Sequence, residues 1–596
     1  MAFTMTVAEL IDADTSGMLG KHATWERVPL AEVATILNGA PFDSALFSTT
    51  EGMPLVRIRD VTTGQTSTYY TGPYEDEYLV QQGDLLVGMD GDFNSGFWGP
   101  KTALLNQRVC RISPVEPFYD KRLLAFTLPG YLAAINANTP SVTVKHLSSK
   151  TIGEIGLPLP PRAEQTRIVD KLEELFSDLD AGVTELKAAQ KKLVLYRQAL
   201  LKAAVEGALT VKWRANNTPS ETGAQLLERI LQERRVHWEA KQLAKFAQQG
   251  KTPPKDWQKK YPEPLAPDTT ELPELPEGWV WASVDQCSLD EFAITDGPFG
   301  SNLKSSHYEE TGPRVIRLQN IGDGVFIDAK AHISEEHYKE LKKHAVEKND
   351  LVVAMLGEVL PRACIIPSGV SPAIVKADCA RIRLNTNLAI PHVVMSQLNS
   401  KPIRDVVLKF VKGIGRPRVN LGHIRAIPLA VCSMEEQREI ARALVDAESS
   451  IEEQMKAIDH SLKQSTAQRQ NILRAAFAGQ LVPQDANDEP ASVLLERIRA
   501  KRAERAKQSK TRKPKQQKEI IAMVNQLKDV LAKAGDWVPA QEAFQRCGIA
   551  DGALTERIEE LYAELRKLDK AGYLAVEAVT DAQGRKLYDK LKLLAG

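Results

Sequence analysis

Apolar residues recur at alternating spacings of four and three along two stretches of the chain. The first series is Ile168, Leu172, Leu175, Leu179, Gly182, Leu186, Ala189, Leu193, Tyr196 and Leu200. The second series is Ile440, Leu444, Ala447, Ile451, Gln454, Ile458, Ser461, Ser465, Gln468 and Ile472. Heptads sustained over this length predict coiled-coil helices. We expect spacer helices within residues 161–211 and 433–482, each roughly 60–65 Å long at about 1.5 Å per residue.

The second series contains polar residues, which in a coiled coil fix the alignment and the choice of partner at some cost in stability. One such helix alone would suggest dimerisation between chains. Two helices in one chain, each after a similar domain, favour an antiparallel pair within the molecule. Dimerisation through a coiled coil remains the alternative.

Each predicted helix follows a segment with a different pattern. In residues 21–160 and 273–432, short β-branched runs alternate with Gly, Pro, Asn and Asp clusters, which indicates short strands joined by turns. These segments, called domain 1 and domain 2, predict mixed domains of the α+β class. Residues 1–20 form an N-terminal extension.

The two halves of the chain repeat each other at a shift of 272 positions. The identical pairs include Glu164 with Glu436, Gln165 with Gln437, Arg197 with Arg469, and Gln198 with Gln470. A repeat of this length means two copies of a whole domain plus helix, and we expect the copies to be related by a pseudo-twofold axis. The order of motifs is kept while the loops differ, and loops usually carry specificity.

The remaining segments lie outside the domains and helices. Residues 212–272 contain a basic spacer and an acidic, proline-rich linker, and residues 483–518 form a basic linker. We expect the latter to be mostly solvated and disordered, with phosphate contact as a further possibility. Residues 519–596 show three helical segments and a hairpin, the order of a winged helix, although a helical bundle with a hairpin fits equally well.

Composition narrows the class of protein. Lys+Arg and Asp+Glu both number 77, which argues against a histone-like protein, although local basic segments leave nucleic-acid binding open. The six cysteines show no paired spacing, which indicates reduced thiols in the cytoplasm. No apolar run is long enough for a membrane span, and the first twenty residues do not resemble a signal peptide.

Catalytic motifs are absent from the sequence. Gly96 to Thr102 resembles a phosphate-binding loop, but Pro100 removes an amide that such a loop needs. We find no zinc-protease motif, no Ser-His-Asp set and no methyltransferase loop, so we assign no catalytic residue and no metal ligand. Together these absences favour recognition over catalysis.

Candidate recognition residues lie in both domains. Arg, Gln and Asn pair with base edges, and cations on glycine-rich loops contact phosphates. On one strand face of domain 1 we place Arg57 and Arg59. Further candidates are Asn94, Lys101, Arg108, Arg111, Phe299, Ser301, Asn302, Lys304, Arg317, Gln319, Asn320, Arg381, Arg383, Arg416 and Arg418. For each single residue, a solvated polar face is the competing interpretation.

The chain resembles the specificity (S) subunit of Type I restriction–modification enzymes. The resemblance rests on Pro276 to Trp279, Gly297 to Ser301, Ile316 to Ile321, Gly413 to Leu429 followed by Glu436 and Gln437, and Pro158 to Thr166. It covers about residues 21–500. Domain 1 lacks the Gly-Pro-Phe-Gly stretch, and residues 519–596 lie outside the family pattern.

This resemblance implies that each domain recognises one half of a bipartite site in double-stranded DNA. The helices would dock two methyltransferase (M) subunits, with restriction (R) subunits joining the assembly. Helix length would set the gap between the half-sites. S-adenosylmethionine, ATP and Mg would serve these partners, and this chain would bind no cofactor itself. The implied partner-binding residues are Glu164, Gln165, Arg197, Gln198, Glu436, Gln437, Arg469 and Gln470.

Two other functions remain open at this point. A coiled-coil scaffold that binds proteins would show no base-specific affinity for DNA. An autonomous nuclease or methyltransferase would turn over substrate without partners.

Overall fold

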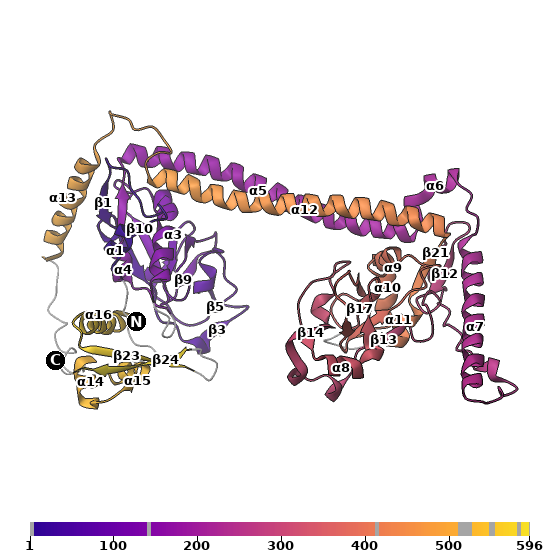
Figure 1. Ribbon diagram of the computed structural model, residues 1–596. Coiled ribbons are helices and arrows are strands. Elements are labelled where there is room, and N and C mark those ends of the chain that lie inside the picture. The colour runs from indigo at the N-terminus through magenta and orange to yellow at the C-terminus, as the bar shows by residue number, and fades with distance from the viewer. Residues whose placement is uncertain are drawn as a thin grey trace. The chain divides into compact units, whose positions relative to one another are not determined.

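The structure is a computed structural model that describes residues 5–139, 145–411, 417–510, 527–547, 555–580 and 586–594. The chain divides into two compact units, unit 1 with residues 1–183 and 463–596, and unit 2 with residues 184–462. Each unit combines a mixed domain of helices and strands with part of each of two long helices (Figure 1). The expected α+β class with long helices is therefore confirmed.

The long helices are α5 (Arg162–Val205) and α12 (Met434–Phe477), with 44 residues each. In unit 1, Arg469 Nη1 donates to Asp180 Oδ1 over 2.7 Å. In unit 2, Gln190 Nε2 donates to Asp459 Oδ1, also over 2.7 Å. Arg197 Nη2 lies 3.6 Å from Glu448 Oε1 in the same unit, so residue numbers rise along α5 as they fall along α12, and the helices are antiparallel in unit 2.

The predicted heptad series is correct near the domains and wrong at three positions, because Tyr196, Gln454 and Gln468 are exposed. Leu172 and Leu200 of α5, and Leu444 of α12, are buried. Tyr196 is 55% exposed instead, and its neighbour Arg197 is half-buried. A straight helix drifts by about 20° per heptad from a strict seven-residue repeat. The apolar ends of the helices also pack into the domain cores, so one seam does not describe the whole helix.

Domain 1 consists of short strands and three helices after the first strand. Its elements are α1 (Val7–Asp12), β1 (Glu26–Pro29), α2 (Leu30–Val33), β2 (Ala34–Asn38), β3 (Phe47–Ser48), β4 (Met53–Val56), β5 (Tyr69–Tyr70), β6 (Leu79–Val80), β7 (Leu85–Gly88), β8 (Ser95–Phe97), β9 (Ala103–Leu105), β10 (Val109–Pro114), α3 (Lys121–Ala137), α4 (Ser149–Gly153) and β11 (Gly156–Leu159). One sheet has the order β2-β10-β7-β8, a second has the order β3-β5-β4-β9-β6, and β1 pairs with β11.

Domain 2 repeats this plan. Its elements are β12 (Val280–Ser283), β13 (Ile294–Asp296), β14 (Tyr308–Ile316), β15 (His332–Ile333), α8 (Glu335–Glu340), β16 (Ala345–Val346), β17 (Leu351–Ala354), β18 (Arg362–Ile365), β19 (Ala373–Val375), β20 (Cys379–Ile382), α9 (Pro391–Leu398), α10 (Lys401–Leu408), α11 (Leu421–Ala426) and β21 (Pro428–Val431). Its sheets have the orders β13-β20-β17-β18 and β15-β14-β19-β16, and β12 pairs with β21. Both domains contain one parallel pair, β4 with β9 and β14 with β19. The sequence repeat therefore corresponds to a repeated topology.

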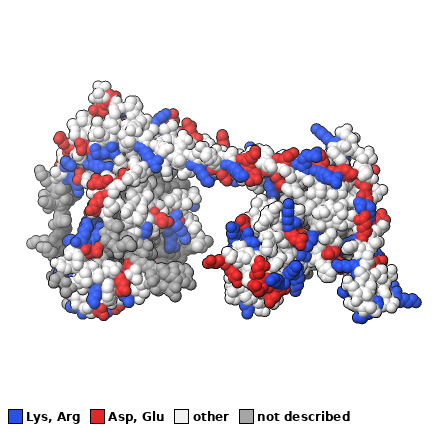
Figure 2. Space-filling model, in the orientation of Figure 1, with Lys and Arg blue, Asp and Glu red and all other residues white. Residues whose placement is uncertain are grey.

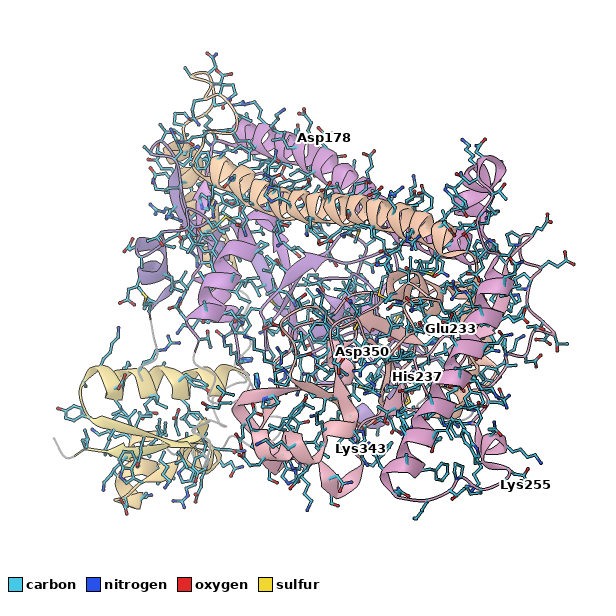
Figure 3. All side chains as sticks on the ribbon, turned by 45° about the vertical axis from the view of Figure 1, so that its right-hand side comes forward. Asp178, Glu233, His237, Lys255, Lys343 and Asp350 are labelled. Carbon is cyan, nitrogen blue, oxygen red and sulfur yellow. The ribbon has the colours of Figure 1, made fainter. Side chains whose placement is uncertain are left out.

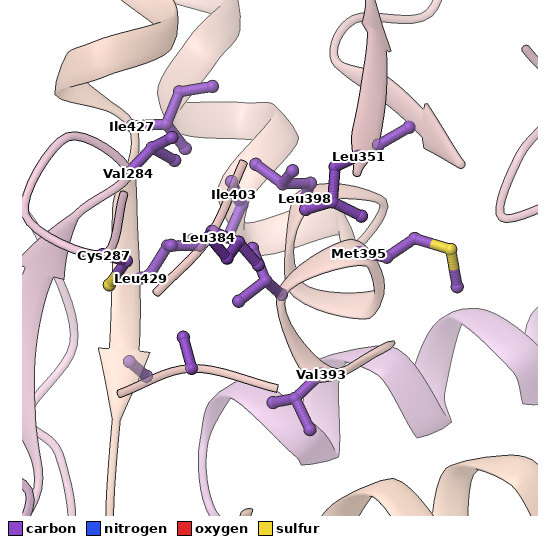
Figure 4. Close-up of a cluster of buried hydrophobic side chains, with 14 of the residues drawn as sticks. Val284, Cys287, Leu351, Leu384, Val393, Met395, Leu398, Ile403, Ile427 and Leu429 are labelled. Atoms are coloured by element: carbon purple, nitrogen blue, oxygen red, sulfur yellow. The ribbon is translucent and has the colours of Figure 1, made fainter. Parts of the chain in front are cut away.

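The core of domain 2 continues into the long helices. Leu398, Ile427 and Leu429 lie in one buried cluster, part of which Figure 4 shows. The same cluster includes Leu201 of α5 and Leu444 of α12. Burial of this apolar surface fixes each domain to the helix ends beside it.

The segments that follow the long helices are helical, which corrects part of the prediction. After α6 (Val211–Asn216), α7 (Gly223–Gln248) occupies much of the expected spacer. Helix α13 (Ala491–Lys510) occupies much of the segment that we expected to be disordered. The physical reason is the apolar stripe Leu494, Leu495 and Ile498, which is buried in the core of unit 1.

The C-terminal segment has its own small core. Its elements are α14 (Leu527–Ala534), β22 (Val538–Pro539), α15 (Ala540–Arg546), α16 (Thr555–Lys570), β23 (Leu574–Thr580) and β24 (Lys586–Leu593). The sheet order is β22-β24-β23. Val538 and Pro539 form a short strand, in which Val538 pairs with Leu591. The winged helix remains a prediction.

Candidate nucleic-acid interface

A capped turn is the structure behind the repeated run at Arg57 and Arg317. Strand β4 ends at Val56 and β14 ends at Ile316, and a short 3-10 turn follows each. The Arg57 amide donates to Asp60 Oδ2 over 2.9 Å, and the Arg317 amide donates to Asn320 Oδ1 over the same distance. Arg57 and Arg59 therefore do not lie on one strand face, as the alternation predicted, although both side chains are exposed.

Asn320 is not available to recognise a base. It is fully buried, and its Nδ2 donates to the carbonyls of Ile327 and Ala329 over 2.9 and 2.8 Å. Arg317 Nη2 also donates to backbone, at Lys330 O over 3.2 Å. Gln319 lies between them and is exposed. Of the three candidates in this run, Gln319 alone has a side chain directed to solvent.

Three other arginine candidates serve the fold. Arg111 Nη1 donates to Leu79 O over 2.6 Å, and Arg383 binds Asp350 through two bonds of 2.7 and 2.8 Å. Arg381 is buried and donates to the carbonyls of Ala345 and Phe292. Burial lowers the pKa of Arg381. These side chains cross-link strands and loops, so they do not form the solvated polar face that was the competing interpretation.

In domain 1, Arg108 belongs to a polar cluster at the end of the sheet. It lies 2.9 Å from Asp90 Oδ2, and Asp90 Oδ1 lies 2.5 Å from His146 Nδ1. Nearly half of the Arg108 side chain remains exposed. The Asn94 backbone carbonyl accepts from the Gly88 amide, and its Oδ1 is buried without a partner among the described residues. Lys101 is exposed.

Domain 2 presents a loop of exposed candidates. Phe299 is 48% exposed, and Ser301, Asn302 and Lys304 are also exposed. The Arg418 guanidinium lies 5.9 Å from the Phe299 ring centroid and 2.9 Å from Asp378 Oδ1. Arg416 lies outside the described residues, so the expected phosphate contact by Gly413 to Arg418 stays a prediction.

Two histidines that the sequence analysis did not assign hold this loop. His337 Nε2 lies 2.9 Å from the Asn302 carbonyl, and the His307 ring packs edge-on at 4.4 Å between centroids. The His307 Nδ1 accepts from the Lys304 amide. The capping serine Ser334 before α8 is the one sequence signal that could have placed His337 on a helix beside the loop.

The glutamates predicted to bind partners are buried links inside the chain. Trp25 Nε1 donates to Glu164 over 3.0 Å, and Trp279 Nε1 donates to Glu436 over 2.9 Å. Each glutamate also binds the segment that follows the other long helix. Gln484 donates to Glu164, and Arg214 donates to Glu436 over 2.5 Å. Burial raises the pKa of Glu164, while the bond from Trp25 opposes this shift.

The glutamines beside them have an equally internal position. The Asp120 amide donates to Gln165 Oε1 over 2.8 Å, and the Ile390 amide donates to Gln437 Oε1 over 3.0 Å. All four residues are almost fully buried. Their position corrects the expectation of partner contact, because they have no free surface and instead fasten each domain to its helix.

Four further candidates for partner binding lie along the helices. Arg197 donates to the Asp323 carbonyl over 3.0 Å. The Arg469 guanidinium lies 4.1 Å from the Phe176 ring centroid. Gln198 is half-buried and Gln470 is exposed. The two arginines are therefore occupied within the chain, and of the glutamines Gln470 faces solvent.

Charges on the described surface are mixed. Figure 2 shows Lys and Arg beside Asp and Glu over the visible face of domain 2. Within the described residues, no cluster of three or more His, Cys, Asp or Glu has metal-binding geometry. No helix in the same residues has the length and apolar character to span a membrane.

Comparisons with known proteins give one consistent result. A family model described as "Type I restriction modification DNA specificity domain" matches residues 22–191. The Type I restriction enzyme EcoBI specificity subunit of Escherichia coli is 34% identical over 519 residues, covering 84% of this chain and 97% of that protein. The StySPI specificity subunit of Salmonella potsdam is 21% identical over 509 residues, covering 80% and 95%.

Comparison with solved structures gives a match to the fold of this chain. A chain described under "Structural basis underlying complex assembly and conformational transition of the type I R-M system" matches with a TM-score of 0.50 and 16% identity. The match covers 76% of this chain and 98% of that chain.

Proposed function

The chain belongs to the family of Type I restriction enzyme specificity subunits, and we propose that it directs its assembly to a bipartite DNA target. Domain 1 and domain 2 would each recognise one half of the site. A scaffold without affinity for DNA is not favoured, because the family match lies in a DNA specificity domain.

The observation that carries this proposal is that the two domains share a backbone arrangement but present different side chains on it. Residue 90 bridges to residue 146 in domain 1, and residue 356 bridges to residue 418 in domain 2, at matching places in the two topologies. At the first place, Arg108 and His146 flank Asp90. At the second place, Arg418 joins Asp378 and Phe299. The same backbone thus offers different donors and apolar contacts, as two different half-sites require.

Exchange of one domain tests the proposal. Residues 273–432 would be replaced by the corresponding domain of the EcoBI specificity subunit, and adenine methylation would be mapped across the genome by sequencing. We expect one half-site to change and the other to persist. The reciprocal exchange of residues 21–160 is the matched control and should change the other half. Loss of both halves, or a change in neither, would contradict the proposal.

Partner subunits would dock on the long helices. In support, Val194, Leu195 and Tyr196 are consecutive large apolar residues on α5 that are more than half exposed, with Leu195 at 69%. The matching positions in α12 are Thr466, Ala467 and Gln468, so the patch belongs to one helix of the pair. Exposed apolar patches commonly mark protein interfaces. Leu195→Ser should reduce copurification of an M subunit, and Thr466→Ser should leave it unchanged.

Catalysis would belong to those partners, two M subunits together with R subunits. The M subunits would use S-adenosylmethionine to methylate an adenine flipped from the helix, and the R subunits would use ATP and Mg to cleave DNA. The purified chain, given these three components and DNA, should neither methylate nor cut. Adding M subunits should restore methylation. Turnover by the chain alone would refute this assignment.

A further inference from the structure

Helix α7 continues beyond the core of domain 2 into a separate hairpin. Leu226, Leu227 and Ile230, in the first part of α7, are buried in the domain core. Arg234 then donates to the carbonyls of Asp285 and Ser288 over 2.8 and 3.2 Å. After this anchor Lys241 Nζ lies 5.9 Å from the Phe292 ring centroid of domain 2, and the helix ends at Gln248. We call residues 238–261 the lysine hairpin.

Aromatic rings hold the two arms of the lysine hairpin together. The Trp238 and Trp257 rings stack with centroids 5.9 Å apart, and Tyr261 packs edge-on against Trp238 at 5.4 Å. Phe246 packs edge-on against Trp257 at 6.2 Å. Gly250 ends the helix in the left-handed region with φ of 63°. Such packing gives this segment a defined backbone that a solvated linker would lack.

Lysines dominate the surface of this hairpin. Six are exposed, at positions 241, 245, 251, 255, 259 and 260, against two acids, Glu239 and Asp256. Lys259 pairs with Asp256 over 3.2 Å, but both side chains are largely exposed, so the pair adds little stability. Grouping like charges on an ordered segment costs electrostatic energy, which a bound polyanion would offset.

The lysine hairpin lies at the same end of unit 2 as α8. In Figures 1 and 3, the tip of α7 and the α8 region both lie at the end of this unit that is distant from α5 and α12. Figure 3 labels Lys255 at this tip and Lys343 just after α8, whereas Glu233 lies higher on α7. The loop with Phe299 and Lys304 belongs to this end, because His337 of α8 binds it.

We propose that the lysine hairpin binds the phosphate backbone of duplex DNA beside the half-site that domain 2 recognises. This inference rests on the proposed function and adds a contact outside the two recognition domains. Lysine provides a flexible point charge without the planar geometry that guanine recognition favours. The hairpin therefore strengthens binding to any flanking sequence and does not choose the site.

The test uses the full-length chain assembled with its M subunits. Lys251, Lys255 and Lys260 would each be changed to Gln, because they are exposed and form no ion pair within the part of the chain that the structure describes. Two duplexes would be compared, both carrying the mapped target. One ends at the domain 2 half-site, and the other extends about one helical turn, roughly ten base pairs, beyond it.

The wild-type assembly should bind the longer duplex more tightly, and the triple variant should lose this difference. The slope of log affinity against log salt should fall by about two to three units for the longer duplex. The methylated sequence should stay the same. Changing the same three lysines to Arg should preserve both the length effect and the slope.

A charge-matched control separates local contact from net charge. Lys528, Lys533 and Lys567 are exposed lysines of the C-terminal segment. Their change to Gln should leave the length effect intact, and an equal loss would overturn the inference. An unchanged salt slope in the hairpin variant would also overturn the inference. Loss of M subunits from the variant's assembly would overturn it too, because it would identify the hairpin as a protein interface. Failure of the wild type to prefer its target would instead refute the proposed function.

Discussion

At the scale of single residues, identical side chains of the repeat have different partners. Arg197 and Arg469 occupy matching positions 272 residues apart. Arg469 lies over the Phe176 ring, and Arg197 lies 3.6 Å from Glu448, which is the repeat counterpart of Phe176. The sequence shows the identity of the arginines, but their partners depend on how the antiparallel helices align. The repeat therefore predicted where the two arginines lie on their helices, but it could not predict which residues they contact.

The buried bond between Trp279 and Glu436 should contribute strongly to stability. Trp279→Phe removes the indole donor and leaves a carboxylate oxygen buried without it, which should cost about 2–3 kcal/mol. Trp281→Phe is the control, because Trp281 donates to Pro273 O at a more exposed site. Urea midpoints measured on both variants should show the larger loss for Trp279. Equal losses would mean that ring volume, and not the bond, determines the effect.

Gly207 should tolerate alanine poorly for two separable reasons. Its φ is 71°, and an added Cβ would lie 2.6 Å from Pro276 Cγ. Gly250 has a φ of 63° but open space around its Cβ position. Gly250→Ala should therefore cost only the backbone term, about 1–2 kcal/mol, and Gly207→Ala should cost more. Thermal unfolding compares the two, and an equal loss would show that the contact with Pro276 relaxes freely.

At the scale of elements, the period of the hydrophobic pattern and the length over which it repeats determined which helices and strands could be predicted. The two long helices, of 44 residues each, followed from the heptads that run from Ile168 to Leu200 and from Ile440 to Ile472. The strands have two to nine residues, and at Arg57 a short alternation suggested a strand where Asp60 caps a turn. Helix α13 was not predicted because most of its residues are charged, and only a few apolar residues pack it against the core of unit 1. Contacts between distant segments, such as Gln484 with Glu164, leave no local pattern.

The paired helices predict how insertions should behave. One heptad inserted after Leu186 should misalign α5 against α12 and weaken DNA binding. A second heptad after Ile458, near the matching point of α12, should restore the pairing. Seven residues add about 10.5 Å of helix, so methylation mapping should find a gap longer by roughly three base pairs. A restored protein that methylates the original gap would show that helix length does not set the spacing.

At the scale of the whole molecule, the basic segment after α12 contains the boundary between the repeated architecture and an added module. The buried cluster of the C-terminal segment comes entirely from residues 527–591. Among the described residues, the cluster of unit 1 contains Leu494 and Ile498 of α13 and none that follows them. The two clusters therefore have no described residue in common.

Truncation on either side of α13 tests this boundary. A chain that ends after Lys518 retains the whole core of unit 1, so it should keep its M subunits and methylate the same sequence. A chain that ends after Pro490 loses Leu494, Leu495 and Ile498 from that core. Since loss of one such side chain costs about 2–5 kcal/mol, this shorter chain should lose unit 1 and with it one half-site. If the longer truncation stays folded but methylates a different sequence, residues 519–596 take part in recognition, and the two domains do not determine the site alone.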